Sequence, residues 1–350
     1  MRHALSKAEF RPLTWGPFRV LLRPRQVKIA AVLALAVGLL VIYGVTRGSL
    51  PIPTSAIGRA LFYPDVLSAQ QMYIVRDIRL PRLLMAVFCG GMLGLAGAAM
   101  QSITRNGLAD PGLIGVKEGT SVVVLTLILA FPSLSLTWRP LAGMLGGMLV
   151  ALLVMVLARD LSRPRFILIG IGVSWALSAA MGLFVTTADI RDVQTAMTWL
   201  AGSLHAATWP LLAVAVAWAL PAVVILYLSA RAADVAMLGN QVASSLGVRL
   251  ARLTLLRFLA PVVLTAASVS CVGSLGFVGL MAPHMARFLL PGGQASLLTG
   301  SALIGTLLVL LTDTLGRLAF APLQIPAGII ISLIGCPFFI LLLWRRRDAL

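Results

Sequence analysis

One apolar stretch of the sequence carries a proline, a histidine and an arginine close together. Residues 276–287 read GFVGLMAPHMAR, so Pro283, His284 and Arg287 end a glycine-rich run. Helix-breaking and ionisable residues are costly at membrane depth unless they line a cavity, meet a partner or reach an interface. No second histidine, cysteine or carboxylate lies at ligand spacing, which disfavours a metal site. We expect His284 to be structural, with Pro283 bending its helix and Arg287 reaching water.

Other candidate chemistry is sparse. Neither an HExxH nor a GxSxG motif occurs, and a phosphate-binding GxxxxGKS or GxxxxGKT loop is excluded because no lysine follows a glycine. Asp313 is the single acid close to the core of an apolar run. An ion-coupled carrier usually buries more acids, although one acid leaves that class open. The sequence therefore predicts neither an enzyme nor a resident cofactor or metal.

The composition is that of a membrane protein. The mean hydropathy is +0.99, and the 350 residues are 59% hydrophobic but only 11% charged, unlike a soluble domain of this length. A net charge of +17 could indicate nucleic-acid binding, but the basic residues flank apolar segments rather than forming one domain. The cysteines Cys89, Cys271 and Cys336 lie singly in apolar runs, which is typical of small buried hydrophobes.

Apolar runs recur along the whole chain. They predict an all-α, polytopic membrane protein with about ten transmembrane helices. The runs are Val27–Thr46, Leu80–Ile103, Gly119–Phe131, Leu141–Ala158, Phe166–Thr187, Leu211–Leu228, Leu253–Cys271, Leu275–Leu290, Leu297–Thr312 and Ala327–Trp344.

The distribution of basic residues predicts the topology. With the N-terminus inside and the sides alternating, the inner segments carry 20 Lys and Arg and the outer segments carry eight. This is a clear positive-inside bias. We therefore expect a basic cytoplasmic tail over residues 1–26, a ten-helix transmembrane domain over 27–344, and a basic cytoplasmic tail over 345–350.

Spacing within two regions suggests close contacts. Gly90, Gly94 and Ala98 follow one another at four-residue intervals, which favours tight helix packing over a hinge. In the long inner loop 231–252, apolar residues also recur every four positions and predict a short amphipathic helix outside the bilayer. From the pattern alone, an interfacial helix and a docking helix for a cytoplasmic partner are equally favoured. The apolar positions are Leu238, Val242 and Leu246.

Several blocks of the sequence occur together in one known family. RLPR at Arg79–Arg82, then Gln101, then RNGLADPGLIG at Arg105–Gly115, resembles the start of the FecCD-type permeases. These are the membrane subunits of type II ABC importers for iron-siderophores, haem and cobalamin. Gly107 departs from the family, in which most members have proline in an RNPLA block. Further blocks in the family's order are WLAGSL, LGNQVASSLGV, GFVGLMAPHMAR, DTLGR, IPAGII and GCPFF.

The resemblance implies a complex. Two permease subunits, identical or sister, would surround a central pathway above two ATPase subunits, and a periplasmic or lipid-anchored binding protein would deliver the substrate. The implied function is ATP-driven import of a ferric siderophore across the bacterial inner membrane, with no nucleic-acid partner. The alternatives are haem or cobalamin import by the same fold, or, in another class, an ion-coupled secondary transporter using Asp313.

The resemblance also implies four groups of site residues. The segment 236–247 is expected to form one helix that couples to the ATPase, and three arginines are expected to grip acidic residues of the binding protein. The expected coupling residues are Leu238, Gly239, Val242, Ala243, Leu246 and Gly247; the docking residues are Arg79, Arg82 and Arg317; the pathway residues are Gly170, Gly172, Ser174, Gly328, Ser332 and Gly335; and the inner-gate residues are Ser162 and Arg163.

Overall fold

The structure is a computed structural model of the chain. It describes residues 11–15, 18–48, 52–53, 55–56, 68–131, 138–159, 164–321 and 323–346. The expected inner-gate residues Ser162 and Arg163 lie outside the described residues.

Each apolar run predicted from the sequence overlaps a helix of the described chain. Seven of the described helices are long and apolar enough to cross a membrane, and a shorter apolar helix spans Ala327–Leu342. The helices that overlap the ten runs are α1 (Pro24–Thr46), α4 (Leu80–Ile103), α5 (Val116–Ala130), α6 (Trp138–Ala158), α7 (Pro164–Thr187), α9 (Trp209–Leu228), α12 (Leu250–Val272), α13 (Val278–Leu289), α14 (Gln294–Leu318) and α15 (Ala327–Arg346).

Shorter elements connect these helices. An N-terminal hairpin, which the sequence did not predict, pairs two antiparallel strands with Arg11 opposite Leu22. A π-helical turn continues α3 into α4 as one long rod. The short elements are β1 (Arg11–Trp15), β2 (Phe18–Leu22), α3 (Ala69–Tyr73), η3 (Ile74–Arg79), η4 (Pro111–Ile114), α8 (Ile190–Leu200), α10 (Ala230–Ala236) and α11 (Asn240–Ser245).

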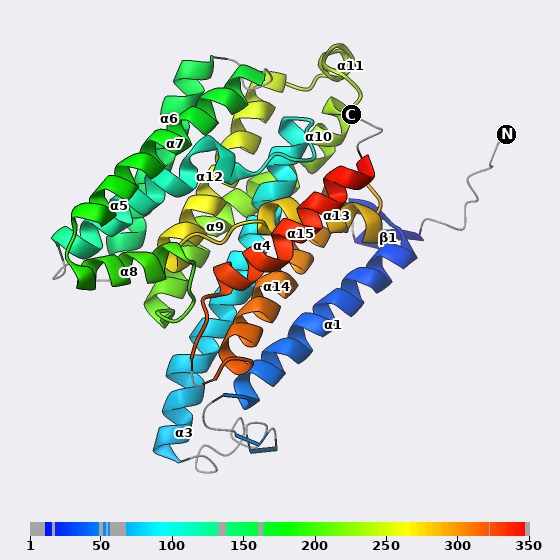
Figure 1. Cartoon of the computed structure of the whole chain (residues 1–350). Coiled ribbons are helices and arrows are strands. Elements are labelled where there is room, and N and C mark those ends of the chain that lie inside the picture. Colours follow the sequence, from blue (N-terminus) through cyan, green and yellow to red (C-terminus); the bar gives the residue numbers. More distant parts are fainter. Residues whose placement is uncertain are drawn as a thin grey trace.

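Helix α4 forms the centre of the bundle. It packs against α14, α12 and α13, while α5, α6 and α7 lie on one side and α1 and α15 on the other (Figure 1). A Cβ added at Gly90 would overlap the backbone of Gly305, and one added at Gly94 would overlap the backbone of Ser301. The tight packing predicted from the glycine spacing is therefore confirmed, because only glycine lets α4 and α14 approach this closely.

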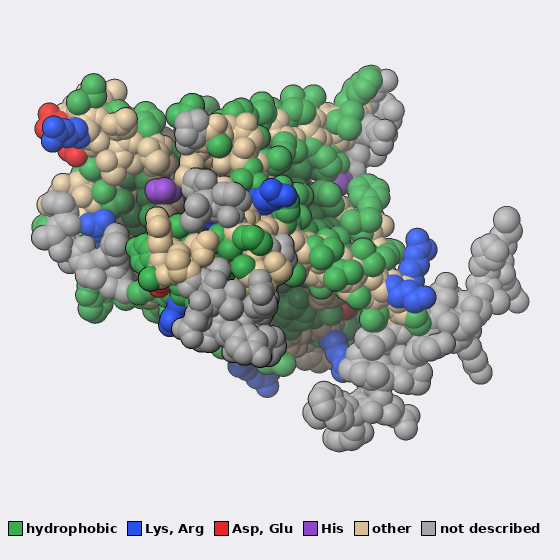
Figure 2. All heavy atoms as spheres, turned by 90° about the horizontal axis from the view of Figure 1, so that it is seen from below, with side chains coloured by type: hydrophobic (Ala, Val, Ile, Leu, Met, Phe, Trp, Pro, Cys, Tyr) green, Lys and Arg blue, Asp and Glu red, His purple; other side chains and the backbone are tan. Residues whose placement is uncertain are grey.

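The two ends of the bundle differ in their connections. The α10–α11 segment projects at one end, and α3 lies at the other (Figure 1). At the α11 end, Gln26 of α1 donates to the carbonyl of Pro291, in the turn before α14. Hydrogen bonds thus join segments that the positive-inside count assigns to the same side. Seen from below, the described surface is largely hydrophobic, with scattered basic groups and a few acidic and histidine side chains (Figure 2).

Candidate functional site

The α10–α11 segment, residues 230–247, presents an apolar stripe to its surroundings. Leu238 is 67% exposed, Val242 45% and Leu246 63%. Exposed aliphatic side chains at four-residue spacing are typical of a surface that another molecule covers. The helix expected across 236–247 is wrong in its bounds, because α10 ends at Ala236 and α11 covers only Asn240–Ser245.

One glycine lies in this break, and a second follows the end of α11. Gly239 has φ 115° and Gly247 has φ 81°, conformations that side chains with a Cβ rarely adopt. A Cβ added at either position would meet nothing within 4 Å, so neither glycine is needed for close packing inside the chain. Ala243 is fully buried and faces the protein itself. Of the expected coupling residues, Leu238, Val242 and Leu246 are therefore exposed, whereas Ala243 packs α11 against the bundle.

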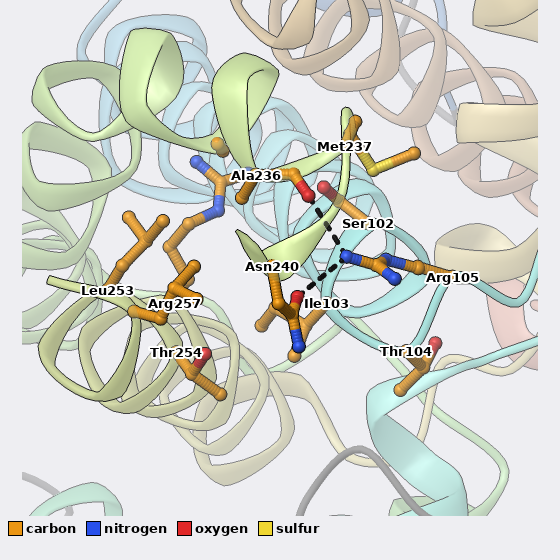
Figure 3. Close-up of a pocket in the computed structure, with 12 residues that line it drawn as sticks. Ser102, Ile103, Thr104, Arg105, Ala236, Met237, Asn240, Leu253, Thr254 and Arg257 are labelled. Atoms are coloured by element: carbon orange, nitrogen blue, oxygen red, sulfur yellow. Dashed lines mark hydrogen bonds between the residues drawn. The ribbon is translucent and has the colours of Figure 1, made fainter. Parts of the chain in front are cut away.

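Arg105 ties this segment to the end of α4. Its Nη2 donates to the carbonyl oxygen of Ala236 at 2.9 Å and to Oδ1 of Asn240 at 3.0 Å (Figure 3). One guanidinium nitrogen thus bonds both the last residue of α10 and the first residue of α11. The contact holds the two short helices, α10 and α11, in their orientation relative to α4.

Arg105 adopts an unfavourable backbone conformation. Helix α4 ends at Ile103, and the amide of Asn106 donates back to the carbonyl of Gln101 at 3.2 Å. This is a Schellman closure, in which the residue at the Arg105 position is left-handed and is usually glycine. Arg105 has φ 49°. A side chain in this region costs roughly 1–2 kcal/mol relative to the right-handed one, so the sequence tolerates strain here.

A second anchor joins the segment to α14. Oδ1 of Asp234, in α10, accepts from the backbone amide of Gln294 at 2.7 Å. Gln294 is the first residue of α14, so the carboxylate caps the positive end of that helix. The side chain of Gln294 in turn accepts from Nη2 of Arg257 at 2.9 Å.

Arg257 completes this second anchor. It is only 2% exposed, and its Nη1 donates to the carbonyl of Leu226 at 3.3 Å and to Oγ of Ser229 at 3.2 Å. The guanidinium of Arg257 therefore joins α12 to the end of α9 and the start of α14. Buried cations need such acceptors because an unsatisfied charge in a low dielectric is very costly.

Hollows lie on both sides of Arg105. A pocket of about 180 Å³ lies between the end of α4, α10 and α12, with Arg257 and Arg105 on its walls (Figure 3). A second hollow of about 520 Å³ lies between Arg105, Asp234 and Arg287. Nη1 of Arg287 donates to Oε1 of Gln101 at 2.6 Å on that side. Neighbouring atoms therefore do not confine the Arg105 contact tightly.

The arginines expected to dock a binding protein have partners within the chain. Nε of Arg82 lies 3.0 and 3.2 Å from the two carboxylate oxygens of Asp313, and its Nη2 lies 2.9 Å from one of them. Its Nη1 donates to Oε1 of Gln324 at 2.8 Å. The guanidinium of Arg82 thus uses most of its donors inside the bundle, where Asp313 is 1% exposed.

The other two arginines bond the C-terminal end of α1. Nη1 of Arg79 donates to the carbonyl of Val45 at 2.6 Å, while Arg317 donates to the carbonyls of Gly44 and Arg47, both at 3.0 Å. The last carbonyls of a helix lack intrahelical partners and carry partial negative charge, so cations stabilise them. Docking by these residues stays a prediction, but all three also hold the bundle together.

The expected pathway residues divide into packed and open positions. A Cβ added at Gly328 would overlap the carbonyl of Ala201, and one added at Gly335 would overlap the ring of Phe277. Gly172, in α7, has no such neighbour. The structure buries Gly170 and Ser174 and half-buries Ser332, whose hydroxyl donates to the carbonyl of Gly328 at 2.8 Å. A pathway role for these residues stays a prediction.

His284 lies inside the bundle. It is 2% exposed, and its ring meets Phe288 edge-on with centroids 5.6 Å apart. Within the described residues, no group of three His, Cys, Asp or Glu side chains could hold a metal ion. The structural role expected for His284 is consistent with this packing and stays a prediction.

Sequence reasoning missed the anchors of the α10–α11 segment. It identified the exposed aliphatic stripe but gave no role to Arg105, Asp234, Asn240 or Arg257. One local signal was available for Arg105. It follows a long apolar run in the sequence Arg-Asn-Gly, at the position where a helix end favours glycine.

Comparison with known proteins gives a consistent result. The sequence model of the FecCD transport family matches residues 19–345. The chain is 34% identical to the iron-uptake system permease protein FeuC of Bacillus subtilis, covering 88% of this chain and 94% of FeuC. It is 38% identical to the vitamin B12 import system permease protein BtuC of Vibrio cholerae, covering 81% and 86%. A solved structure described as an inward-facing, metal-chelate type ABC transporter superposes with a TM-score of 0.80, 30% identity, and coverage of 91% and 99%.

Proposed function

The chain belongs to the FecCD transport family, and on this premise we propose that it forms the pathway by which a ferric siderophore crosses the bacterial inner membrane. It is a transport permease subunit of an ABC importer and not an enzyme. The observation that carries the proposal is the family match over nearly the whole chain, together with relatives named for iron and iron-chelate uptake. Haem and cobalamin are the alternative substrates, because other relatives are named for hemin and vitamin B12.

The exposed stripe of the α10–α11 segment supports coupling to an ATPase. We propose that Leu238, Val242 and Leu246 insert into a groove of that subunit on the cytoplasmic side. A secondary carrier would need no such docking surface. Both chain ends would then be cytoplasmic, since α1 begins and α15 ends toward the α11 end (Figure 1).

The state of Asp313 weighs against ion coupling. A carboxylate that binds and releases a coupling ion must be free to change its ligands. Asp313 is instead buried against the guanidinium of Arg82, with three short N–O distances. Releasing it would leave an unpaired charge in a low dielectric, which is strongly unfavourable. We therefore favour ATP hydrolysis as the energy source.

The remaining partners complete the proposal. A second permease subunit would face α7 and α15, where Leu168, Trp175 and Leu333 are all more than two-thirds exposed. A periplasmic or lipid-anchored binding protein would deliver the chelate at the end opposite α11. We propose that Arg79 and Arg317 contact the binding protein. Arg82 would act there only indirectly, through its bonds to Asp313 within the bundle.

Reconstitution tests the proposal. The permease, its ATPase and its binding protein would be placed in proteoliposomes with ATP inside or absent, and uptake of a ferric siderophore, haem and cobalamin compared. We expect ATP-dependent uptake of the ferric siderophore above the other two. Preferred uptake of haem or cobalamin would reassign the substrate. Uptake driven by an ion gradient in the absence of ATP would overturn the assignment to ATP-driven import.

A further inference from the structure

We propose that Arg105 is the latch through which the ATPase-bound segment moves α4. Resting on the proposed function, this inference names the residue that transmits the motion rather than the surface that binds the ATPase. The latch is defined as the two hydrogen bonds from Nη2 of Arg105 to the carbonyl of Ala236 and to Oδ1 of Asn240 (Figure 3).

The backbone of Arg105 is the first argument. The Schellman closure at the end of α4 requires a left-handed residue, and glycine adopts that conformation without steric strain. The chain places an arginine there at φ 49°. Strain of this kind persists where a side chain has a task that the stabler residue could not perform. The bonds from the guanidinium of Arg105 to the α10–α11 segment identify that task.

The contrast between the two anchors is the second argument. The anchor formed by Asp234, Gln294 and Arg257 combines a charged helix cap, supplied by the exposed Asp234, with a buried glutamine and a cation that is only 2% exposed. The Arg105 anchor is exposed, and its two acceptors are neutral. Water can replace such bonds at small cost, because a neutral acceptor at the surface is readily solvated. The first anchor therefore acts as the pivot, and the Arg105 anchor is the contact that opens and closes.

The space around the latch is the third argument. Hollows of about 180 Å³ and about 520 Å³ flank Arg105, so the guanidinium and the start of α11 have room to move. Helix α4 packs against α14, α12 and α13. A displacement of its C-terminal end is therefore passed to the centre of the bundle. Packed interiors transmit strain of this kind because they are poorly compressible.

Arg105→Gly provides the decisive variant, because it removes the latch while relieving the backbone strain. In the reconstituted complex we expect it to melt at or above the wild-type temperature and to retain its ATPase. We expect the ATP hydrolysed per chelate imported to rise about fivefold or more, the lower range of a typical coupling energy. Arg105→Ala should raise the same ratio while keeping the strained backbone. A role confined to folding would lower the melting temperature and leave that ratio unchanged.

Asn240 supplies the matched tests. Asn240→Asp gives Arg105 a charged acceptor, and we expect the tighter latch to slow uptake. The same change in the Arg105→Gly background should have no effect, because the donor is gone. Gln241→Ala, on the same short helix and exposed, is the control and should import like the wild type. Suppose that the wild-type complex imports the chelate and that Arg105→Gly hydrolyses the same amount of ATP per chelate imported. That result would overturn the latch alone. A wild type without ATP-driven uptake would instead overturn the proposed function.

Discussion

The residues of the family motifs lie in opposite environments at the two ends of the bundle. At the α11 end, the motif residues Leu238, Val242 and Leu246 stay exposed while polar side chains anchor the segment from behind. At the opposite end, the motif arginines are bonded within the chain: Arg82 to Asp313 and Gln324, the other two to the last carbonyls of α1.

This difference separates two kinds of motif residue. A motif residue that is exposed and apolar has no structural task inside the chain, so its exposure points to a partner. A motif residue that is buried or fully hydrogen-bonded already has such a task. The α11 end therefore supports a docking surface directly, whereas the arginine cluster first explains how α1, α4 and α14 are held together.

The largest effect is expected from breaking the Arg82–Asp313 pair. Arg82→Met leaves the carboxylate of Asp313 buried without its cation, which should cost about 3–5 kcal/mol of stability. Thermal melting of the purified permease in detergent measures this loss, with Arg76→Met, at an exposed position, as the control. A wild-type melting temperature combined with weak binding-protein affinity would make Arg82 a docking residue and end the contrast between the two ends.

The next largest effect is expected at the exposed stripe. Leu238→Asp with Val242→Asp places two charges in the proposed apolar contact, and we expect uptake to fall more than tenfold or the ATPase to dissociate, as is common when hot-spot residues are altered. Copurification of the ATPase and uptake in proteoliposomes measure this. Gln241→Asp with Ser244→Asp adds the same charge to the same segment and should have a small effect. Normal copurification and uptake in the first variant would refute the coupling assignment.

A smaller effect is expected at Arg317. Arg317→Gln removes charged donors from the carbonyls of Gly44 and Arg47, and we expect a loss of about 1–3 kcal/mol in stability. Thermal melting measures that loss, and binding-protein affinity at low salt measures any docking role, since rim charges act mainly on encounter. Reduced affinity at an unchanged melting temperature would show that Arg317 serves the partner rather than α1.

The smallest effect is expected at His284. His284→Gln keeps a polar side chain of similar reach, and we expect uptake to fall by less than about twofold, within the range of mild substitutions. Uptake of the chelate by the assembled complex checks this. Loss of uptake with intact assembly would assign His284 a direct role and add a functional site in the middle of α13.

The sequence predicted what depends on local pattern. The ten apolar runs all overlap helices, and seven of the described helices are long and apolar enough to span a bilayer, because length and hydropathy decide that capacity. The stripe at Leu238, Val242 and Leu246 was visible because its spacing is local. The break at Gly239 was missed because apolar periodicity continues across it, and positive φ leaves no mark on that pattern.

Contacts between distant segments could not be predicted in this way. The partners of Arg82 lie 231 and 242 positions away in the chain, and those of Arg105 more than 130. Charge counting assigned Arg79, Arg82 and Arg317 to outer segments, which stays a prediction, and it could not distinguish a guanidinium facing a partner from one facing a carbonyl of α1. That distinction requires the packing of α1, α4 and α14.

Hydrogen–deuterium exchange tests the contrast between the two ends most directly. Exchange would be followed in the permease alone, with its ATPase, and with its binding protein, over residues 237–247 and 76–82 together. We predict that the ATPase slows exchange over 237–247, and that the amides over 76–82 exchange slowly in the permease alone because the arginines already hold that region. Unchanged exchange over 237–247 with the ATPase bound, or fast exchange over 76–82 that slows only with the binding protein, would contradict the account.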